Sequence, residues 1–130
     1  MEAASHPALA RIVARAEADP DILAIILFGS RARGEAGPGS DVDVCLVLAS
    51  ASPSDVEAGR KRLEYLSLAE VDVAVFQQLP LHIRSRVLKE GRVLFARDED
   101  ALYALAARTA RRYDAFRHIQ RLYLDEVARG

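Results

Sequence analysis

Two aspartates open an apolar run that otherwise has the composition of a buried β-strand. Asp41 and Asp43 begin the segment DVDVCLVLA at residues 41–49. Because side chains alternate along a strand, both carboxylates are predicted to point to one side of the sheet, with Val42, Val44 and Leu46 pointing into the core. Two carboxylates so close repel each other unless a cation lies between them, and Mg²⁺ favours such hard oxygen ligands. The pair indicates a metal site, although Asp-x-Asp alone also occurs at solvated strand starts.

A third carboxylate follows in the next predicted strand. Asp72 is the third residue of the segment EVDVAVFQ at residues 70–77, between two valines. If strands 41–48 and 70–76 pair, Asp72 can reach the side of the sheet that carries Asp41 and Asp43. The alternative is an exposed residue on a half-buried strand. Three carboxylates directed at one patch fit a two-metal site for phosphoryl transfer.

The loop that precedes these aspartates has features of a phosphate-binding turn. An apolar run at 22–29 ends in Gly29-Ser30, and glycine lets a phosphate approach the backbone closely while the following N–H groups bind anions. Ser30 adds a hydroxyl donor, and Arg31 and Arg33 add two fixed positive charges. A plain turn and a solvated loop are the alternatives for these residues taken singly.

Together these residues carry a family resemblance. The segment GSRARGEAGPGSDVDV resembles the signature of the nucleotidyltransferase superfamily related to DNA polymerase β, which is Gly-Ser, ten residues and then Asp-x-Asp. Followed by VDVAV, it is similar to the minimal nucleotidyltransferases (MNT) found beside HEPN-domain proteins in prokaryotic toxin–antitoxin pairs. The resemblance covers residues 22–97 by motif and order.

The resemblance implies a reaction and a set of site residues. It implies that AMP is transferred from ATP to a hydroxyl, expected to be a tyrosine, of a partner HEPN ribonuclease toxin, which neutralises the toxin. Two Mg²⁺ ions would be held by the three aspartates, Asp41, Asp43 and Asp72, which are also the catalytic residues. The nucleotide would be bound by five loop residues: Gly29, Ser30, Arg31, Arg33 and Ser40. Two alternatives stay open: an antitoxin that acts by stoichiometric binding alone, and the catalytic subunit of a small-molecule, aminoglycoside-type nucleotidyltransferase.

The elements that must position these residues follow from apolar spacing and from glycine and proline breaks. Residues 1–130 are expected to form a single domain with a core at about 22–97. The fold class is α/β (α+β), a mixed sheet covered by helices. Strands are predicted at 22–29, 41–49, 70–77 and 92–97, the last at an edge, and helices at 7–18, 52–68, 79–91 and 98–128. The first two strands are joined by about a dozen residues, which is short for a parallel crossover, so they should be antiparallel or obliquely paired.

Helical spacing also predicts which side chains face inward. Ser52 is expected to cap the helix at 52–68, with Val56, Leu63 and Leu66 inward. Ile83, Val87 and Leu88 should face the core from the next helix, which Gly91 ends. Asp98 should cap the last helix, whose apolar stripe is expected to be core: Leu102, Leu105, Ala106, Tyr113, Phe116, Ile119, Tyr123 and Val127.

Composition narrows the class of protein. A formal net charge of −1 argues against nucleic-acid binding driven by the charge of the whole molecule. Cys45 is the only cysteine, so no internal disulfide can form, and its apolar strand predicts a buried thiol. No apolar run approaches the roughly 20 residues of a membrane span, and the N-terminus lacks the pattern of a secretory signal. We therefore expect a cytoplasmic protein, and the family resemblance implies that it forms a hetero-oligomer with a HEPN partner.

Overall fold

The computed structural model describes residues 6–29, 43–69 and 71–129. The strands and helices follow one another in the predicted order, with one short 3₁₀ helix added. The elements are α2 (Pro7–Glu17), β1 (Ile22–Phe28), β2 (Asp43–Leu48), α3 (Asp55–Leu66), β3 (Asp72–Val75), η1 (Phe76–Gln78), α4 (Leu81–Glu90), β4 (Arg92–Ala96) and α5 (Glu99–Arg129).

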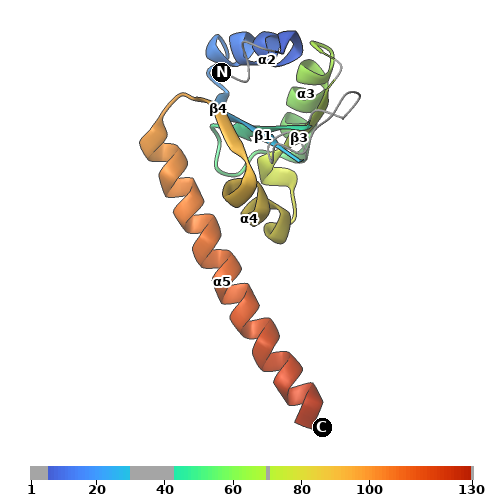
Figure 1. Ribbon diagram of the computed structural model, residues 1–130, viewed down its shortest axis with the longest axis vertical. Coiled ribbons are helices and arrows are strands. Elements are labelled where there is room, and N and C mark those ends of the chain that lie inside the picture. The colour runs from blue at the N-terminus through green and yellow to red at the C-terminus, as the bar shows by residue number, and fades with distance from the viewer. Residues whose placement is uncertain (1–5, 30–42, 70, 130) are drawn as a thin grey trace.

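The four strands form one mixed sheet in the order β3-β2-β1-β4 (Figure 1). β1 pairs with β2 and with β4 in antiparallel fashion, whereas β2 and β3 are parallel. The predicted antiparallel hairpin, the pairing of the second and third strands and the edge position of the fourth strand are all confirmed.

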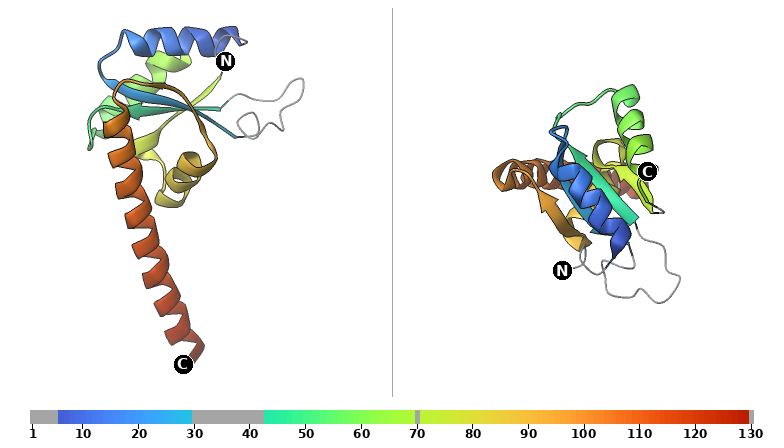
Figure 2. Two further views of the ribbon diagram at one scale, coloured as in Figure 1. Left: turned by 60° about the vertical axis from the view of Figure 1, so that its left-hand side comes forward. Right: turned by 90° about the horizontal axis from the view of Figure 1, so that it is seen from above.

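Helices cover both faces of this sheet, α2 and α3 on one side and α4 and α5 on the other (Figure 2). Val44 and Leu46 of β2 face the α2–α3 side, as predicted, but Cys45 and Val47 are also buried, against α4 and α5. The predicted buried strand is therefore confirmed, with both of its sides covered. Because both faces are covered, the side of β2 that carries Asp43 is accessible only at the start of the strand, where Asp43 is half-buried.

The inward face of α3 differs from the prediction. Val56 and Leu63 are 81% and 67% exposed, and the buried side chains are Ala58, Lys61 and Tyr65. Leu66 alone packs against the core as expected. The helix also begins two residues later than predicted, because the cap is Ser54, whose Oγ accepts a hydrogen bond from the Glu57 N–H at 3.1 Å.

A buried ion pair explains why α3 directs Lys61, rather than Val56 and Leu63, toward the core. Lys61 Nζ lies 2.8 Å from Asp19 Oδ2, in the turn between α2 and β1, and the Tyr65 hydroxyl donates to the same oxygen at 2.9 Å. Burial pushes the pKa of Asp19 upward, but the hydrogen bonds from Lys61, the Asp21 backbone N–H and Tyr65 outweigh it and leave the pKa lowered. Burial likewise disfavours charged Lys61, but the neighbouring carboxylates raise its pKa overall. A polar contact therefore decides which face of α3 is inside.

The helix α4 packs as predicted, with Val87 buried and Ile83 and Leu88 packed against the core. The strand before it is shorter than expected and ends at Val75. Gly91 ends α4 in an extended conformation with φ −76°, which any residue can adopt, so a left-handed cap is not its reason. A Cβ at this position would overlap the Val87 carbonyl oxygen and the Ile26 side chain, so glycine serves close packing of α4 on β1.

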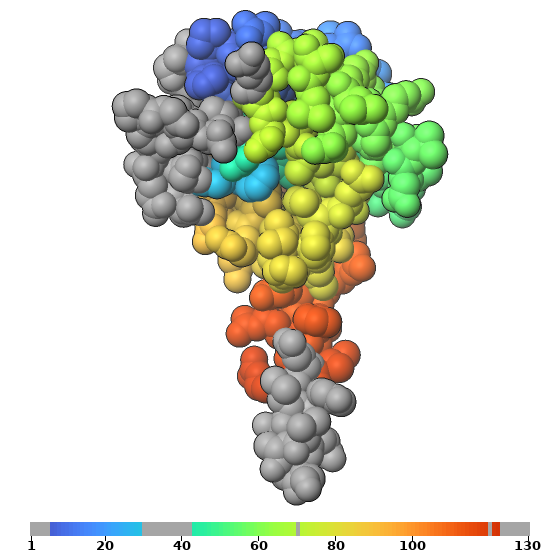
Figure 3. Space-filling view, turned by 90° about the vertical axis from the view of Figure 1, so that its right-hand side faces the viewer, coloured from blue at the N-terminus to red at the C-terminus, as the bar shows by residue number. Residues whose placement is uncertain are grey.

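The long helix α5 is capped by Asp98, whose Oδ1 accepts from the Ala101 N–H at 3.1 Å, as predicted. Only its first part is core, with Leu102 at 7% exposure. Further along the helix projects past the rest of the protein (Figure 3), and Phe116 and Ile119 are 51% and 65% exposed. The expectation of a continuous core stripe is wrong for these two residues. Tyr123 and Val127 lie where the structure describes the backbone alone.

Candidate active site

The candidate site lies where three neighbouring strands end or begin at one edge of the sheet. Gly29 follows the last residue of β1, and Asp43 and Asp72 are the first residues of β2 and β3. Phe28 pairs with Asp43 across the antiparallel ladder, and Asp43 pairs with Asp72 across the parallel one. The topology thus brings together residues that are 14 and 29 positions apart in the sequence (29 to 43 to 72).

Both carboxylates lie on the α4 side of the sheet. Asp43 alternates with Val44, which faces α2 and α3, and so shares its side with Cys45. Val73 and Val75 also face α2 and α3, which places Asp72 on the opposite side with Asp43. The predicted convergence of these two aspartates on one side of the sheet is supported by the strand register.

Gly29 is in direct proximity to the Asp43 carboxylate. Its φ is +84°, a left-handed value that glycine adopts without steric penalty, and it is the only described glycine with a positive φ. A Cβ built on Gly29 would overlap Asp43 Oδ2. The backbone after β1 therefore approaches the carboxylate more closely than any other residue type would allow.

The remaining predicted site residues lie outside the described residues. These are Ser30, Arg31, Arg33, Ser40 and Asp41. Within the described ranges there is no group of three or more His, Cys, Asp or Glu side chains that could hold a metal ion. Asp43 and Asp72 nevertheless fit a Mg²⁺ ion, which needs few protein carboxylates and takes its other ligands from water and substrate phosphates.

Cys45 is not a candidate ligand or nucleophile. It lies two residues after Asp43, on the same side of β2, and is fully buried. This burial raises the pKa of its thiol to about 12. The prediction of a buried, inert cysteine is confirmed.

A cavity of about 210 Å³ adjoins Gly29 on the α4 side of the sheet. Its walls are Phe28, Ile83 and Val87, and its rim carries Arg86 and Glu90, whose side chains form an ion pair at 3.6 Å. Sequence reasoning missed these two charged residues. Their i, i+4 spacing on an exposed helix face is typical of an ordinary surface pair, so only the packing of α4 beside β1 reveals their position.

A comparison with protein families shows which family the chain belongs to. The model of the family described as "Polymerase beta, Nucleotidyltransferase" matches residues 10–100. The chain belongs to this nucleotidyltransferase family. The family predicted from the Gly-Ser and Asp-x-Asp spacing is therefore confirmed.

Individual relatives agree with this assignment. A Methanocaldococcus jannaschii protein, provisionally named a protein adenylyltransferase, is 32% identical over 79 residues, which span 57% of this chain and 56% of that protein. The match thus spans little more than half the length of that relative.

No helix in the described part of the chain is long and apolar enough to cross a membrane.

Solved structures show the same nucleotidyltransferase fold. A chain from a crystal structure of a toxin–antitoxin pair with AMP-PNP superposes with a TM-score of 0.66 at 19% identity, covering 93% of this chain and 96% of that one. A chain from the complex of a tri-AMPylated Shewanella oneidensis HEPN toxin with its MNT antitoxin gives 0.62 at 16% identity, covering 92% of each. The predicted mixed α/β fold, long C-terminal helix included, is confirmed.

Proposed function

We propose that this nucleotidyltransferase transfers AMP from ATP to a tyrosine hydroxyl of a HEPN-domain toxin and thereby acts as its antitoxin. The observation that carries the proposal is the pairing of Asp43 with Asp72 on adjacent strands, beside the close backbone approach at Gly29. The named relative and the toxin–antitoxin complexes among the structural neighbours favour a protein acceptor.

Each residue has a defined part in the proposed reaction. Asp43 and Asp72, with Asp41, would hold two Mg²⁺ ions, which when bound supply positive charge to the triphosphate. Gly29, followed by Ser30, would let the β- and γ-phosphates approach the backbone, and Arg31 and Arg33 would neutralise the departing charge.

The chemical step is a displacement at the α-phosphorus. The acceptor hydroxyl oxygen forms a bond to the α-phosphorus. At the same time the bond between the α-phosphorus and the α–β bridging oxygen breaks, and pyrophosphate leaves. Asp72, exposed at the edge strand, would accept the hydroxyl proton on its carboxylate. Asp43 is half-buried and so is better suited to fix the position of the metal than to exchange protons with solvent.

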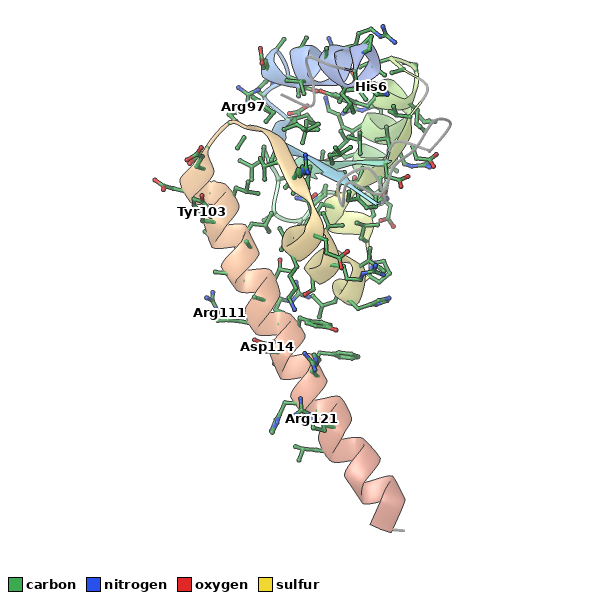
Figure 4. The ribbon with its side chains drawn as sticks, in the orientation of Figure 1. His6, Arg97, Tyr103, Arg111, Asp114 and Arg121 are labelled. Atoms are coloured by element: carbon green, nitrogen blue, oxygen red, sulfur yellow. The ribbon has the colours of Figure 1, made fainter. Side chains whose placement is uncertain are left out.

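The surface of α5 supports a protein partner. Beyond Tyr113 it exposes Phe116, Ile119 and Leu122, which are 51%, 65% and 53% accessible. Arg117 and Arg121 lie in the same part of the helix, and Figure 4 shows Arg111, just before Tyr113, directed away from the rest of the protein. Apolar residues with arginine are the composition of protein interfaces rather than of solvated helices. We assign this surface to the HEPN toxin.

The decisive experiment combines the chain, MgATP and its HEPN partner, followed by mass spectrometry of both proteins. A mass increase of the partner equal to AMP, located on a tyrosine, is expected. Asp43→Asn should lower the rate more than about 100-fold, since loss of residues that merely support a metal ligand already costs 10–100-fold. Asp55→Asn, an exposed aspartate at the start of α3, is the matched control and should retain activity.

Other results would point to the alternatives. Inhibition of the toxin with no mass increase favours stoichiometric binding, and the double variant Phe116→Ser/Ile119→Ser should then abolish inhibition. Transfer of AMP to an aminoglycoside but not to the partner favours the small-molecule enzyme. Full activity of Asp43→Asn would rule out the metal site.

A further inference from the structure

The cavity between β1 and α4 has a composition that neither the metal site nor the core explains. The end of β1 lies beside α4 at the surface (Figure 3), and the cavity between them is lined in part by Gly29, the residue whose backbone approaches Asp43. It is on the same side of the sheet as Asp43 and Asp72, because Phe28, Ile83 and Val87 belong to the α4-side cluster. A group bound here would lie beside the reacting phosphates.

The walls of the cavity suit a flat apolar group. Phe28, Ile83 and Val87 provide aromatic and branched aliphatic surface, and the volume of about 210 Å³ is enough for one ring system with little surplus. Binding sites for small molecules commonly combine such walls with a few polar groups that fix orientation.

The rim supplies one strong donor and one strong acceptor side by side. Arg86 presents only N–H donors, and the Glu90 carboxylate presents only acceptors. Their ion pair is long at 3.6 Å and both side chains are largely accessible, at 63% and 45%. An exposed pair of this kind contributes little to stability, and the accessible Arg86 and Glu90 side chains can each form a further hydrogen bond with a ligand.

We propose that this cavity binds the nucleobase of the donor nucleotide, with Arg86 and Glu90 reading its edge; the proposal rests on the proposed nucleotidyl transfer. An adenine edge carries a ring nitrogen that accepts and an amino group that donates, which match Arg86 and Glu90 respectively. The ring lies against Phe28 and Ile83, and the α-phosphate reaches the carboxylates past Gly29.

The rival occupant is the ring of the acceptor tyrosine. A phenol offers a single polar group, and during transfer that hydroxyl must lie at the α-phosphorus, so it cannot also satisfy Arg86 and Glu90. The paired donor and acceptor at the rim therefore favour the base.

Calorimetric titration of the full chain in the presence of Mg²⁺ tests the proposal without requiring turnover. The ligands are a non-hydrolysable ATP analogue, its GTP counterpart and inorganic tripolyphosphate. Arg86→Ala and Glu90→Ala should each weaken the ATP analogue about 10-fold, as expected for loss of one hydrogen bond to a charged group. Tripolyphosphate, which has no base, should bind each variant within about 2-fold of the unmodified protein.

Two more variants complete the design. Ile83→Phe fills the cavity and should weaken the ATP analogue while leaving tripolyphosphate unchanged. His82→Ala, an exposed position on the same helix that does not line the cavity, is the matched control. Weaker binding of the GTP analogue than of the ATP analogue, with the difference lost in Glu90→Ala, would further support recognition of the amino group.

The outcomes separate this inference from the proposed function. If Asp43→Asn weakens both phosphate ligands but the three cavity variants bind the ATP analogue normally, the metal site stands and base binding here is overturned. If the cavity variants change only the KM for the partner protein, the cavity binds the acceptor and the proposal is also overturned. If the unmodified protein binds neither ligand, both proposals fail.

Discussion

Replacing Gly29 by alanine tests the geometry of the site most directly, because two independent effects of one methyl group can be measured separately. The first is conformational. A left-handed backbone costs an L-residue about 1–2 kcal/mol, while the alanine also reduces the entropy of the unfolded chain by about 0.4–1 kcal/mol. The free energy of unfolding should therefore fall by about 1 kcal/mol, which lowers Tm by roughly 4 °C for a domain of this size.

The second effect falls on the Asp43 carboxylate. The new Cβ would overlap Oδ2, whereas Cγ and Cβ of Asp43 would lie at 3.4 and 3.5 Å, an ordinary contact distance. Only the carboxylate oxygen has to move, and rotation of the side chain suffices. The overlap should thus add little to the loss of stability but displace a metal ligand, with a 10–100-fold loss of Mg²⁺-dependent affinity for an ATP analogue.

Calorimetric melting and titration of Gly29→Ala, Asp43→Ala and the double variant distinguish these effects. The changes in unfolding free energy should add within about 0.5 kcal/mol, because alanine at 43 removes the overlap but not the strain at 29. Unchanged Mg²⁺-dependent nucleotide affinity in Gly29→Ala would refute the contact with Asp43. A larger coupling in stability would show that the backbone, not the carboxylate, moves.

Three further predictions concern the scaffold. Asp19→Asn removes the nearest carboxylate of Lys61, which keeps Asp21 at 3.1 Å and Glu64 at 3.2 Å, and urea unfolding should show a loss of about 1–3 kcal/mol. The same pair should limit stability at both ends of the pH range in a urea midpoint profile. Because the pKa of Asp19 is lowered, its contribution to stability is present above its ordinary pKa of 3.8 and is lost as the pH falls through the folded-state pKa. Because the pKa of Lys61 is raised, its contribution is present below its ordinary pKa of 10.5 and is lost as the pH rises through the folded-state pKa. Gly91→Ala should cost about 1–3 kcal/mol in the same assay because its Cβ meets the Val87 carbonyl, whereas Gly59→Ala, which meets nothing in α3, should stabilise by up to about 1 kcal/mol.

Local sequence patterns were sufficient to predict the strands and the side of the sheet to which Asp43 and Asp72 point. The short connection between β1 and β2 favours an antiparallel pair, and alternation places Asp43 opposite to Val44. These features depend on neighbouring residues along the chain, and for that reason they are readable without coordinates.

The orientation of α3 could not be read in the same way. Apolar spacing placed Val56 and Leu63 inside, but Lys61 lies there instead, because its partner Asp19 is 42 positions away in the sequence. No periodicity within the helix records a partner in a distant turn. A buried ion pair thus overrides the rule that apolar side chains face the core, provided that its charges are hydrogen-bonded.

The long apolar stripe of α5 shows a different limit. Its spacing is regular from Leu102 to Phe116, yet only the first of these is buried by the rest of the chain. Periodicity reports that one face of a helix is apolar and says nothing of whether this chain or another covers it. The extent of the exposed part, rather than the pattern itself, is the argument for a partner protein.

The position of the carboxylates follows from the burial of both faces of the sheet. A carboxylate at Cys45 would point to the same side as Asp43, but that position is fully buried beneath α4 and α5, where an ionised group would remain without solvent or a metal. Two residues earlier, at the first residue of β2, Asp43 is only half-buried, and under the proposed function substrate phosphates would reach its oxygen atoms there. Asp72 at the first residue of β3 and Gly29 just after β1 satisfy the same condition. We therefore propose that this end of the described strands, where Asp43 and Asp72 are paired, is where the sheet would bind a metal and meet a nucleotide.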